Sequence, residues 1–230
     1  MGLLLAIETS ARTGSIALLR TAVAPTADEL LGQMVLDAGQ RHDEQLLAAI
    51  DALITRHGCA VADLTAVAFG AGPGSFTGVR LGAAAAQGIG WAIGIPVFGV
   101  SSVDALALGV TRRFPGVAVA VAVDARMSQV YWRWRDEDSS AYASCSLLDA
   151  AGFVALPMPA VPFIGAGDGW LTAVVTDAWR ERAAQLIPDA VPHALDIATL
   201  AGQAWQSGAR PPAGDAQPCY LVGADAWHRR

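Results

Sequence analysis

The stretch Phe69–Arg80, FGAGPGSFTGVR, holds the residue types that most often bind phosphate in proteins. Four glycines and two hydroxyl side chains come directly before a run that reads as a helix. Glycines let the backbone approach a ligand closely, and the free N–H groups at a helix N-terminus attract anions. The chemistry that this stretch suggests is therefore the binding of a nucleotide phosphate.

None of the common phosphate-loop patterns fits the stretch. A P-loop needs a lysine, and all 15 basic residues of this chain are arginines. The first two glycines of the dinucleotide pattern G-x-G-x-x-G occur at two places in the chain. At both places the third glycine is replaced, by Thr77 at one and by Trp170 at the other. The pattern G-x-S-x-G of a nucleophile elbow is absent as well. Anion binding and simple capping of the following helix by Ser75 both stay open.

Two carboxylates stand where apolar strands end. Glu8 closes the run LLLAI and is followed by Thr9 and Ser10, and Asp124 closes the run VAVAVAV. A carboxylate at a strand tip can hold a metal-bound water while neighbouring hydroxyls face phosphate oxygens. Glu8, Thr9 and Ser10 are therefore candidate phosphate-binding residues, with solvated turns as the alternative. An acid–base pair of Glu8 and Asp124 is a further option that the sequence leaves open.

Metal and thiol chemistry have little support. The histidines show none of the spacings of zinc enzymes, and the cysteines form no C-x-x-C pair. We therefore predict no metal site and no catalytic residue. The residues concerned are His42, His57, His193, His228, Cys59, Cys145 and Cys219.

The elements that must position these residues form two similar halves. Residues 3–20 read as a hairpin, a third strand and an amphipathic helix follow, and residues 64–72, 76–93 and 95–102 read as strand, helix and strand. A second hairpin opens at residue 117, with a later helix over 194–206. The pattern predicts an α/β chain with lobes at residues 1–110 and 111–230, a boundary near 108–115, and a mixed sheet with helices in each lobe. Two lobes that open in this way resemble the actin-like (ASKHA, RNase H-like) fold.

Charge and hydropathy exclude several classes of protein. The net charge of −6 and the pI near 5.1 argue against binding of a nucleic-acid backbone by this chain alone. The uncharged stretch 81–100 holds five glycines and a proline, so we predict no membrane span. Because Glu8 interrupts the first apolar run and no basic segment precedes it, we expect no signal peptide and a cytoplasmic location.

Seven segments together resemble the TsaB (YeaZ) family. They are LLAIETS, RHDEQLLAAID, AFGAGPGSFTGVRLGAAAAQGIG, IPVFGVSSVDALA, VAVDARMSQVYW, FIGAGDGW and the terminal PCYLVGADAW. The resemblance implies a non-catalytic companion subunit in the formation of threonylcarbamoyladenosine at position 37 of tRNAs that read codons beginning with A. It also implies binding to the catalytic subunit TsaD and work with the ATPase TsaE. Alternatives are a stand-alone small-molecule kinase or ATPase of the same fold, and a peptidase.

The chain departs from the catalytic relative where that relative binds metal. TsaD carries an H-x-x-x-H motif after the glycine-rich helix, and Ser102 and Leu106 stand at the corresponding places here. Without that cation the transfer chemistry loses its main electrostatic element. We expect no cofactor in the isolated chain, and ATP or ADP at the TsaD interface stays open. The family further implies a homodimer when the chain is alone, with tRNA bound only through the complex.

The resemblance places the partner interface in the N-terminal lobe. Gly78, Gly82, Ala86 and Gly90 recur every four residues and form a row of small side chains that would let another helix approach closely. Ala86→Arg is therefore expected to leave the fold intact and to prevent association. The predicted interface residues are Leu46, Ile50, Gly74, Ser75, Phe76, Thr77, Gly78, Arg80, Gly82 and Ala86.

Overall fold

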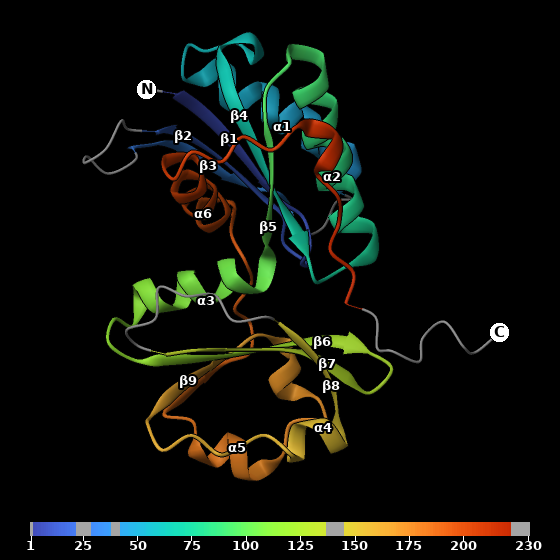
Figure 1. Cartoon of the computed structure of the whole chain (residues 1–230), viewed down its shortest axis with the longest axis vertical. Coiled ribbons are helices and arrows are strands. Elements are labelled where there is room, and N and C mark those ends of the chain that lie inside the picture. The colour runs from blue at the N-terminus through green and yellow to red at the C-terminus, as the bar shows by residue number, and fades with distance from the viewer. Residues whose placement is uncertain (1, 22–28, 38–41, 137–144, 222–230) are drawn as a thin grey trace, which may run out of the picture. The chain divides into compact units, whose positions relative to one another are not determined.

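The computed structural model describes residues 2–21, 29–37, 42–136 and 145–221. The chain forms two compact units (Figure 1). Unit 1 contains Met1–Ala105 and Pro192–Cys219, and unit 2 contains Leu106–Val191 and Tyr220–Arg230. The end of the predicted terminal motif, from Val222 onward, lies outside the described residues.

Unit 1 is built on a five-stranded mixed sheet in the order β3-β2-β1-β4-β5. Antiparallel pairing joins β1 to β2 and β2 to β3, while β4 lies parallel to both β1 and β5. The strands are β1 (Gly2–Glu8), β2 (Ser15–Thr21), β3 (Glu29–Val35), β4 (Leu64–Gly72) and β5 (Val97–Ser101). Because the ends of β1, β4 and β5 lie at the same edge, Glu8, Gly72 and Ser101 come close together in space.

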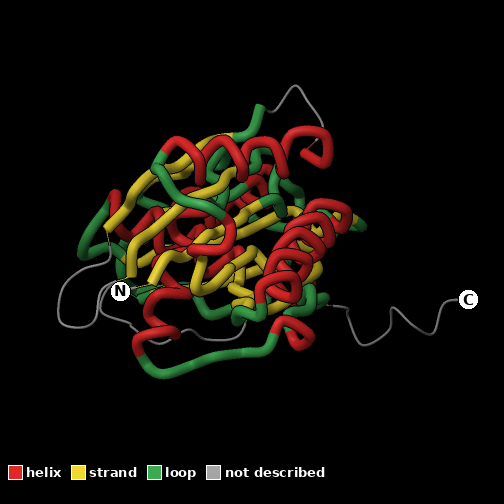
Figure 2. Tube along the Cα trace, turned by 90° about the horizontal axis from the view of Figure 1, so that it is seen from above, coloured by secondary structure: helices red, strands yellow, loops and turns green. Residues whose placement is uncertain are grey.

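Helices cover both faces of this sheet. Leu3, Leu5 and Ile7 of β1 face α1 (His42–Arg56) and α2 (Phe76–Ile93), whereas Leu4 and Ala6 face α6 (Ala194–Gln206). Figure 2 shows helices on both sides of the strands. A strand with apolar residues on both faces needs such double cover, which explains why LLLAI is uninterrupted by polar residues. Short 3₁₀ turns at Val61–Asp63 (η1) and Ala213–Asp215 (η3) complete the unit.

Unit 2 repeats this topology with an aromatic core. Its sheet has the order β10-β9-β6-β7-β8, in which β6, β7 and β8 are antiparallel and β9 and β10 run parallel to β6. Trp132 packs edge-on against Phe153 and Trp179, with ring centroids 5.1 and 5.2 Å apart. The elements are β6 (Ala118–Arg126), β7 (Gln129–Arg135), β8 (Ser146–Asp149), α4 (Ala150–Val154), β9 (Phe163–Ala166), η2 (Asp168–Leu171), α5 (Asp177–Arg182) and β10 (Gln185–Ile187).

The shared topology confirms the predicted duplication and the two-lobed actin-like fold. Two boundaries differ from the sequence-based division. Helix α3 (Ser102–Arg113), which the sequence analysis did not predict, begins in unit 1 and continues in unit 2. The segment Pro192–Cys219 packs in unit 1 rather than with the second half of the chain, because α6 supplies the cover for one face of the first sheet.

Within the described residues, no helix is both long enough and apolar enough to cross a membrane. Helix α2, which contains most of the uncharged stretch, ends at Gly94 in the left-handed conformation. Its first residue follows Ser75, whose side chain accepts a hydrogen bond from the Gly78 N–H and caps the helix as predicted.

Candidate functional site

The hairpin tip in unit 1 is buried rather than open to a ligand. Glu8 is 0% exposed, Thr9 1% and Ser10 5%. These three residues were the candidate phosphate-binding group, and the structure brings them together against the glycine-rich stretch. Their polar atoms bind other parts of the chain.

Hydrogen bonds from two serines hold the Glu8 carboxyl group. Its Oε1 accepts from the Ser10 N–H at 2.5 Å, and its Oε2 accepts from the Ser102 hydroxyl at 2.8 Å. The Ser102 Oγ in turn accepts from the Gly72 N–H at 3.3 Å. Glu8 is thereby linked through one serine to the first backbone N–H of the turn that leads into α2.

The glycines of FGAGPGSFTGVR make room for this hairpin tip. A side chain at Gly70 would collide with the Glu8 carboxyl group, and one at Gly78 would collide with the Thr9 carbonyl oxygen. Ser75 N–H donates to the Ser10 carbonyl at 2.7 Å, and the Thr9 hydroxyl donates to the Gly78 carbonyl at 2.7 Å. The close approach that glycine permits is therefore made by the chain's own residues 8–10.

Burial raises the pKa of Glu8 above its ordinary value of 4.5, and the hydrogen bonds from Ser10 and Ser102 oppose that rise without cancelling it. A carboxyl group with a higher pKa in the folded chain binds protons more tightly there than in the unfolded chain. Its contribution to stability is complete below pH 4.5 and is lost as the pH rises through the folded-state pKa.

This linkage gives a prediction for Glu8→Gln, in which the side chain cannot ionise. Relative to that variant, the free energy of unfolding of the wild-type chain should fall as the pH rises above about 4.5, because only the wild type must then ionise a buried group. Denaturant unfolding of both proteins over a pH series measures the difference. A wild-type-minus-variant difference that stays constant, or rises, over that series would contradict the prediction.

The positions that correspond to the metal ligands of the catalytic relative are both buried. Ser102 is 1% exposed and binds Glu8, while Leu106 is 3% exposed. Among the described residues, no three His, Cys, Asp or Glu side chains gather closely enough to hold a metal ion. The metal-free expectation stays a prediction.

The row Gly78, Gly82, Ala86 and Gly90 faces inward. All four are buried in the monomer: Gly82 lies against Ile7 and Thr9, Ala86 is 0% exposed in the core beneath α2, and Gly90 lies against Val97 and Ala213. Small residues here let α2 approach its own sheet and the segment after α6. The burial of Ala86 argues against the expectation that Ala86→Arg leaves the fold intact.

The solvent-exposed side of α2 carries a different row of residues. Thr77, Ala84, Gly88 and Trp91, called the outer row below, lie on the side of the helix opposite Ala86, and Trp91 is 64% exposed. Arg80 stacks over the ring of Phe76 at 3.3 Å beside this row, and both are exposed. Of the predicted interface residues, Ser75, Phe76, Thr77 and Arg80 are exposed, Gly74 is half-buried, and Leu46, Ile50, Gly78, Gly82 and Ala86 are buried.

Helix α1 packs beside α2 and extends the exposed surface. Its inner residues Leu46 and Ile50 belong to the core, while Leu47 is 66% exposed. Two neighbours of Leu47 are exposed as well: Ala48, which follows it in the sequence, and Asp51, which lies one helical turn further on. The two helices together present Leu47, Trp91 and the small residues of the outer row to solvent.

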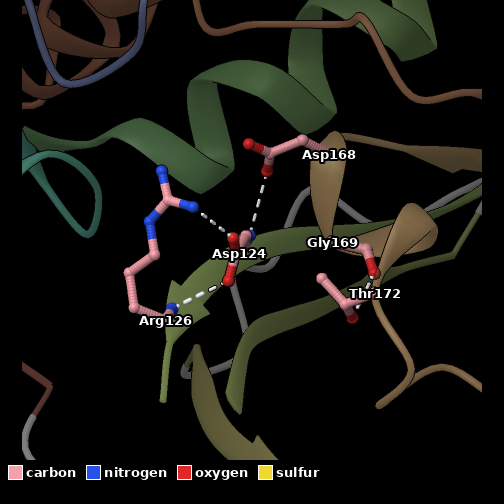
Figure 3. Close-up of polar contacts among 5 residues, drawn as sticks. All are labelled: Asp124, Arg126, Asp168, Gly169 and Thr172. Atoms are coloured by element: carbon pink, nitrogen blue, oxygen red, sulfur yellow. Dashed lines mark hydrogen bonds and ion pairs between the residues drawn. The ribbon is translucent and has the colours of Figure 1, made fainter. Parts of the chain in front are cut away.

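The second hairpin tip, in unit 2, is held differently (Figure 3). The Asp124 N–H donates to the Asp168 carboxylate at 2.9 Å, while the Asp124 carboxylate accepts from the backbone N–H and the guanidinium of Arg126, each at 2.8 Å. Asp124 thus acts as a turn-forming residue within this unit.

The sequence analysis missed the segment that borders α2 after α6. Gln87 donates from its side chain to the Ala216 carbonyl at 2.7 Å, and the Cys219 N–H donates to the Ala71 carbonyl at 2.7 Å. Pro211 accepts from the Val97 N–H at the open edge of β5. The signal in the sequence was the polar Gln87 within an apolar helix, but this residue alone does not identify the segment that it binds.

Comparison with known proteins identifies relatives over the whole chain. The family model for "TsaD: tRNA N6-adenosine threonylcarbamoyltransferase" matches residues 35–199. The tRNA threonylcarbamoyladenosine biosynthesis protein TsaB of Escherichia coli is 29% identical over 98% of this chain and 97% of its own length. The protein of the same name from Haemophilus influenzae is 37% identical, over 56% of this chain and 52% of its own.

Solved structures agree with these relatives. YeaZ from Pseudomonas aeruginosa has a TM-score of 0.79 and 32% identity over 96% of this chain and 100% of its own. A second structure from that organism, described as similar to peptidase YeaZ, has a TM-score of 0.81 and 33% identity with the same coverage. Both likenesses include the two units and their order in the chain.

Proposed function

Because the chain belongs to the TsaB (YeaZ) family of tRNA threonylcarbamoyladenosine biosynthesis proteins, we propose that it is the non-catalytic subunit that binds and activates the catalytic subunit TsaD. The modified nucleotide is N6-threonylcarbamoyladenosine at position 37 of tRNAs that read codons beginning with A. TsaE is the third protein of the proposed assembly. The cytoplasm, where tRNA is modified, is the proposed location.

The observation that carries the docking part of the proposal is the outer row of α2. Gly88 lies in the middle of the solvent-exposed side of α2, and a side chain there would meet nothing within 4 Å. Glycine at such a position costs about 1 kcal/mol relative to alanine, and no contact within unit 1 requires it. A partner helix whose backbone approaches α2 closely would require glycine at this position, because small residues allow short distances between helix axes.

The neighbouring side chains fit the same role. Trp91 of α2 at 64% and Leu47 of α1 at 66% exposure are large apolar groups on the solvent side of these two neighbouring helices, and exposed aromatic groups are typical anchors of protein interfaces. We propose that TsaD docks on this surface, with its own helices against α1 and α2. In the absence of TsaD, a second copy of the chain is the proposed occupant of the same surface.

The proposed absence of catalysis is supported by the hairpin tip. The Thr9 hydroxyl and the Ser10 N–H, which would face a phosphate, donate instead to the Gly78 carbonyl and to Glu8, and the metal ligands of the catalytic relative are replaced by Ser102 and Leu106. The net charge of −6 also favours tRNA binding through the assembled complex rather than by this chain alone.

We expect the isolated chain to release no phosphate from ATP above the rate of a buffer blank. The physical reason is that Glu8, Thr9 and Ser10 are buried and occupied by internal hydrogen bonds. A steady-state assay of phosphate release with and without Mg²⁺ measures this. Steady turnover that disappears in Glu8→Gln would contradict the proposal and favour the stand-alone ATPase.

The docking proposal is tested with purified proteins. Mixing this chain with the TsaD of the same source should give a stable complex on size-exclusion chromatography. The complex should elute earlier than either protein alone and contain equal amounts of the two chains. Separate elution of two folded proteins at micromolar concentration would contradict it.

A further inference from the structure

We propose that the Glu8 carboxyl group acts as an internal hydrogen-bond acceptor that joins the hairpin tip at Ser10 to Ser102 against Gly70, and that it thereby positions the start of α2 for docking. The docking clause of this inference rests on the proposed function, and the first clause does not.

The Glu8 carboxyl group is surrounded by hydrogen-bond donors and by a glycine. Its two oxygens accept from Ser10 N–H and from Ser102 Oγ–H, at 2.5 and 2.8 Å, and the carboxyl lies directly on the backbone of Gly70. A backbone N–H, a hydroxyl and a close glycine are the features that a loop uses to bind an oxyanion. Here all three act on a side chain of the same unit.

Hydrogen bonds connect Glu8 to the start of α2. Ser102 passes the interaction from Glu8 to the Gly72 N–H, and Ser10, whose own N–H binds Glu8, accepts from the Ser75 N–H through its carbonyl. Gly72 has a φ of 92° and Ser75 is the N-cap of α2. Glu8 is therefore joined by two short paths to both ends of the turn that sets where α2 begins.

Both side chains in this hydrogen-bond network are buried. Glu8 and Ser102 are 0% and 1% exposed, so removal of the carboxyl group leaves the buried Ser10 N–H and Ser102 hydroxyl without the acceptor that they have in the wild type. The turn 72–75 would then open more often, and with it the first turn of α2, which carries Thr77 of the outer row.

The decisive experiment removes the carboxyl group and returns it as a small molecule. Glu8→Ala should exchange the amide hydrogens of Gly72, Ser75 and Gly78 at least about tenfold faster than the wild type, since the donors that lose the carboxyl group no longer hold the turn closed. Sodium formate should slow that exchange again in a saturable manner. Sodium chloride at the same ionic strength should have no such effect, nor should formate act on wild type or on Glu8→Gln, whose side chain fills the space.

Matched variants separate positioning from general loss of stability. Ser102→Ala removes the bridge to Gly72 and should accelerate exchange over residues 72–78 while leaving β6 of unit 2 unchanged. Glu181→Ala removes an exposed glutamate on α5 and should change neither. If Glu8→Ala does not fold, hydrogen exchange is measured on Glu8→Gln and Ser102→Ala instead. Glu8→Gln keeps the volume of the side chain, and Ser102→Ala removes only one oxygen atom.

Affinity for TsaD is the last readout. Glu8→Ala should bind TsaD about tenfold more weakly, with affinity restored by formate. Unchanged exchange over residues 72–78 in the folded variants, or no response of Glu8→Ala to formate, would overturn the inference. Failure of the wild-type chain to bind TsaD would instead contradict the proposed function, and the exchange and formate results would still decide the role of Glu8.

Discussion

Ala86→Arg is expected to abolish the cooperative thermal melt of unit 1. Ala86 is 0% exposed and lies in the apolar core beneath α2, between that helix and the first sheet. An arginine there must either bury an unpaired guanidinium or push α2 off the sheet, and either costs several kcal/mol. Since a domain is stable by only about 5–15 kcal/mol, this loss is large enough to unfold a substantial fraction of the chain.

Far-UV circular dichroism as a function of temperature measures this loss. Ala86→Gly, which removes a single buried methyl group, serves as the milder control at the same position and should keep a cooperative melt at lower temperature. A melt of Ala86→Arg within a few degrees of the wild type would show that α2 does not press this row against the sheet.

Ala84→Arg, two residues away on the opposite side of α2, is expected to have the reverse effect. Ala84 is exposed, so its replacement should change the free energy of unfolding by no more than about 0.5 kcal/mol. A guanidinium in the middle of a close helix contact costs about 3 kcal/mol or more, so binding to TsaD should weaken by at least about 100-fold.

The measurement is a binding isotherm with purified TsaD, together with the thermal melt of the variant alone. Ala151→Arg is the matched control, because it places the same side chain on an exposed helix position in unit 2 and should bind normally. Normal binding by a folded Ala84→Arg protein would place the docking surface elsewhere on the chain.

The contrast between these two substitutions shows what the sequence of α2 could not decide. The buried row of Gly78, Gly82, Ala86 and Gly90 is small, and so are Thr77, Ala84 and Gly88 of the outer row, so the size of these residues does not separate the inner from the outer side. The inner side is determined by contacts with Ile7 and Thr9, about seventy residues earlier in the chain. Such long-range contacts leave no local pattern.

The fold was predictable to a greater extent. Each hairpin is short-range, and the repetition of a strand that ends in a carboxylate was visible at Glu8 and Asp124. The assignment of α6 was not, since sequence order puts residues 194–206 with the second lobe. The uninterrupted apolar run of β1 did signal cover on both faces, but it did not say which helix supplies it.

The sequence predicted which residues of the candidate site come together, but it did not predict what they do. Glu8, Thr9, Ser10 and the glycines do come together, as a nucleotide site would require. Ser102 was noted only as a missing metal ligand, although its hydroxyl is what joins Glu8 to Gly72. Whether a loop surrounds a bound ligand or its own side chain depends on burial, which the glycine pattern does not encode.

Reconstitution of tRNA modification tests the central claim most directly. Purified TsaD and TsaE from the same source are incubated with ATP, unmodified tRNA and the threonylcarbamoyl donor, with or without this chain, and threonylcarbamoyladenosine is quantified by mass spectrometry of digested tRNA. The account predicts product only when the wild-type chain is present, with little product from Ala84→Arg and none when TsaD is omitted. Equal product without this chain, or product from this chain without TsaD, would contradict its role as a non-catalytic activating subunit.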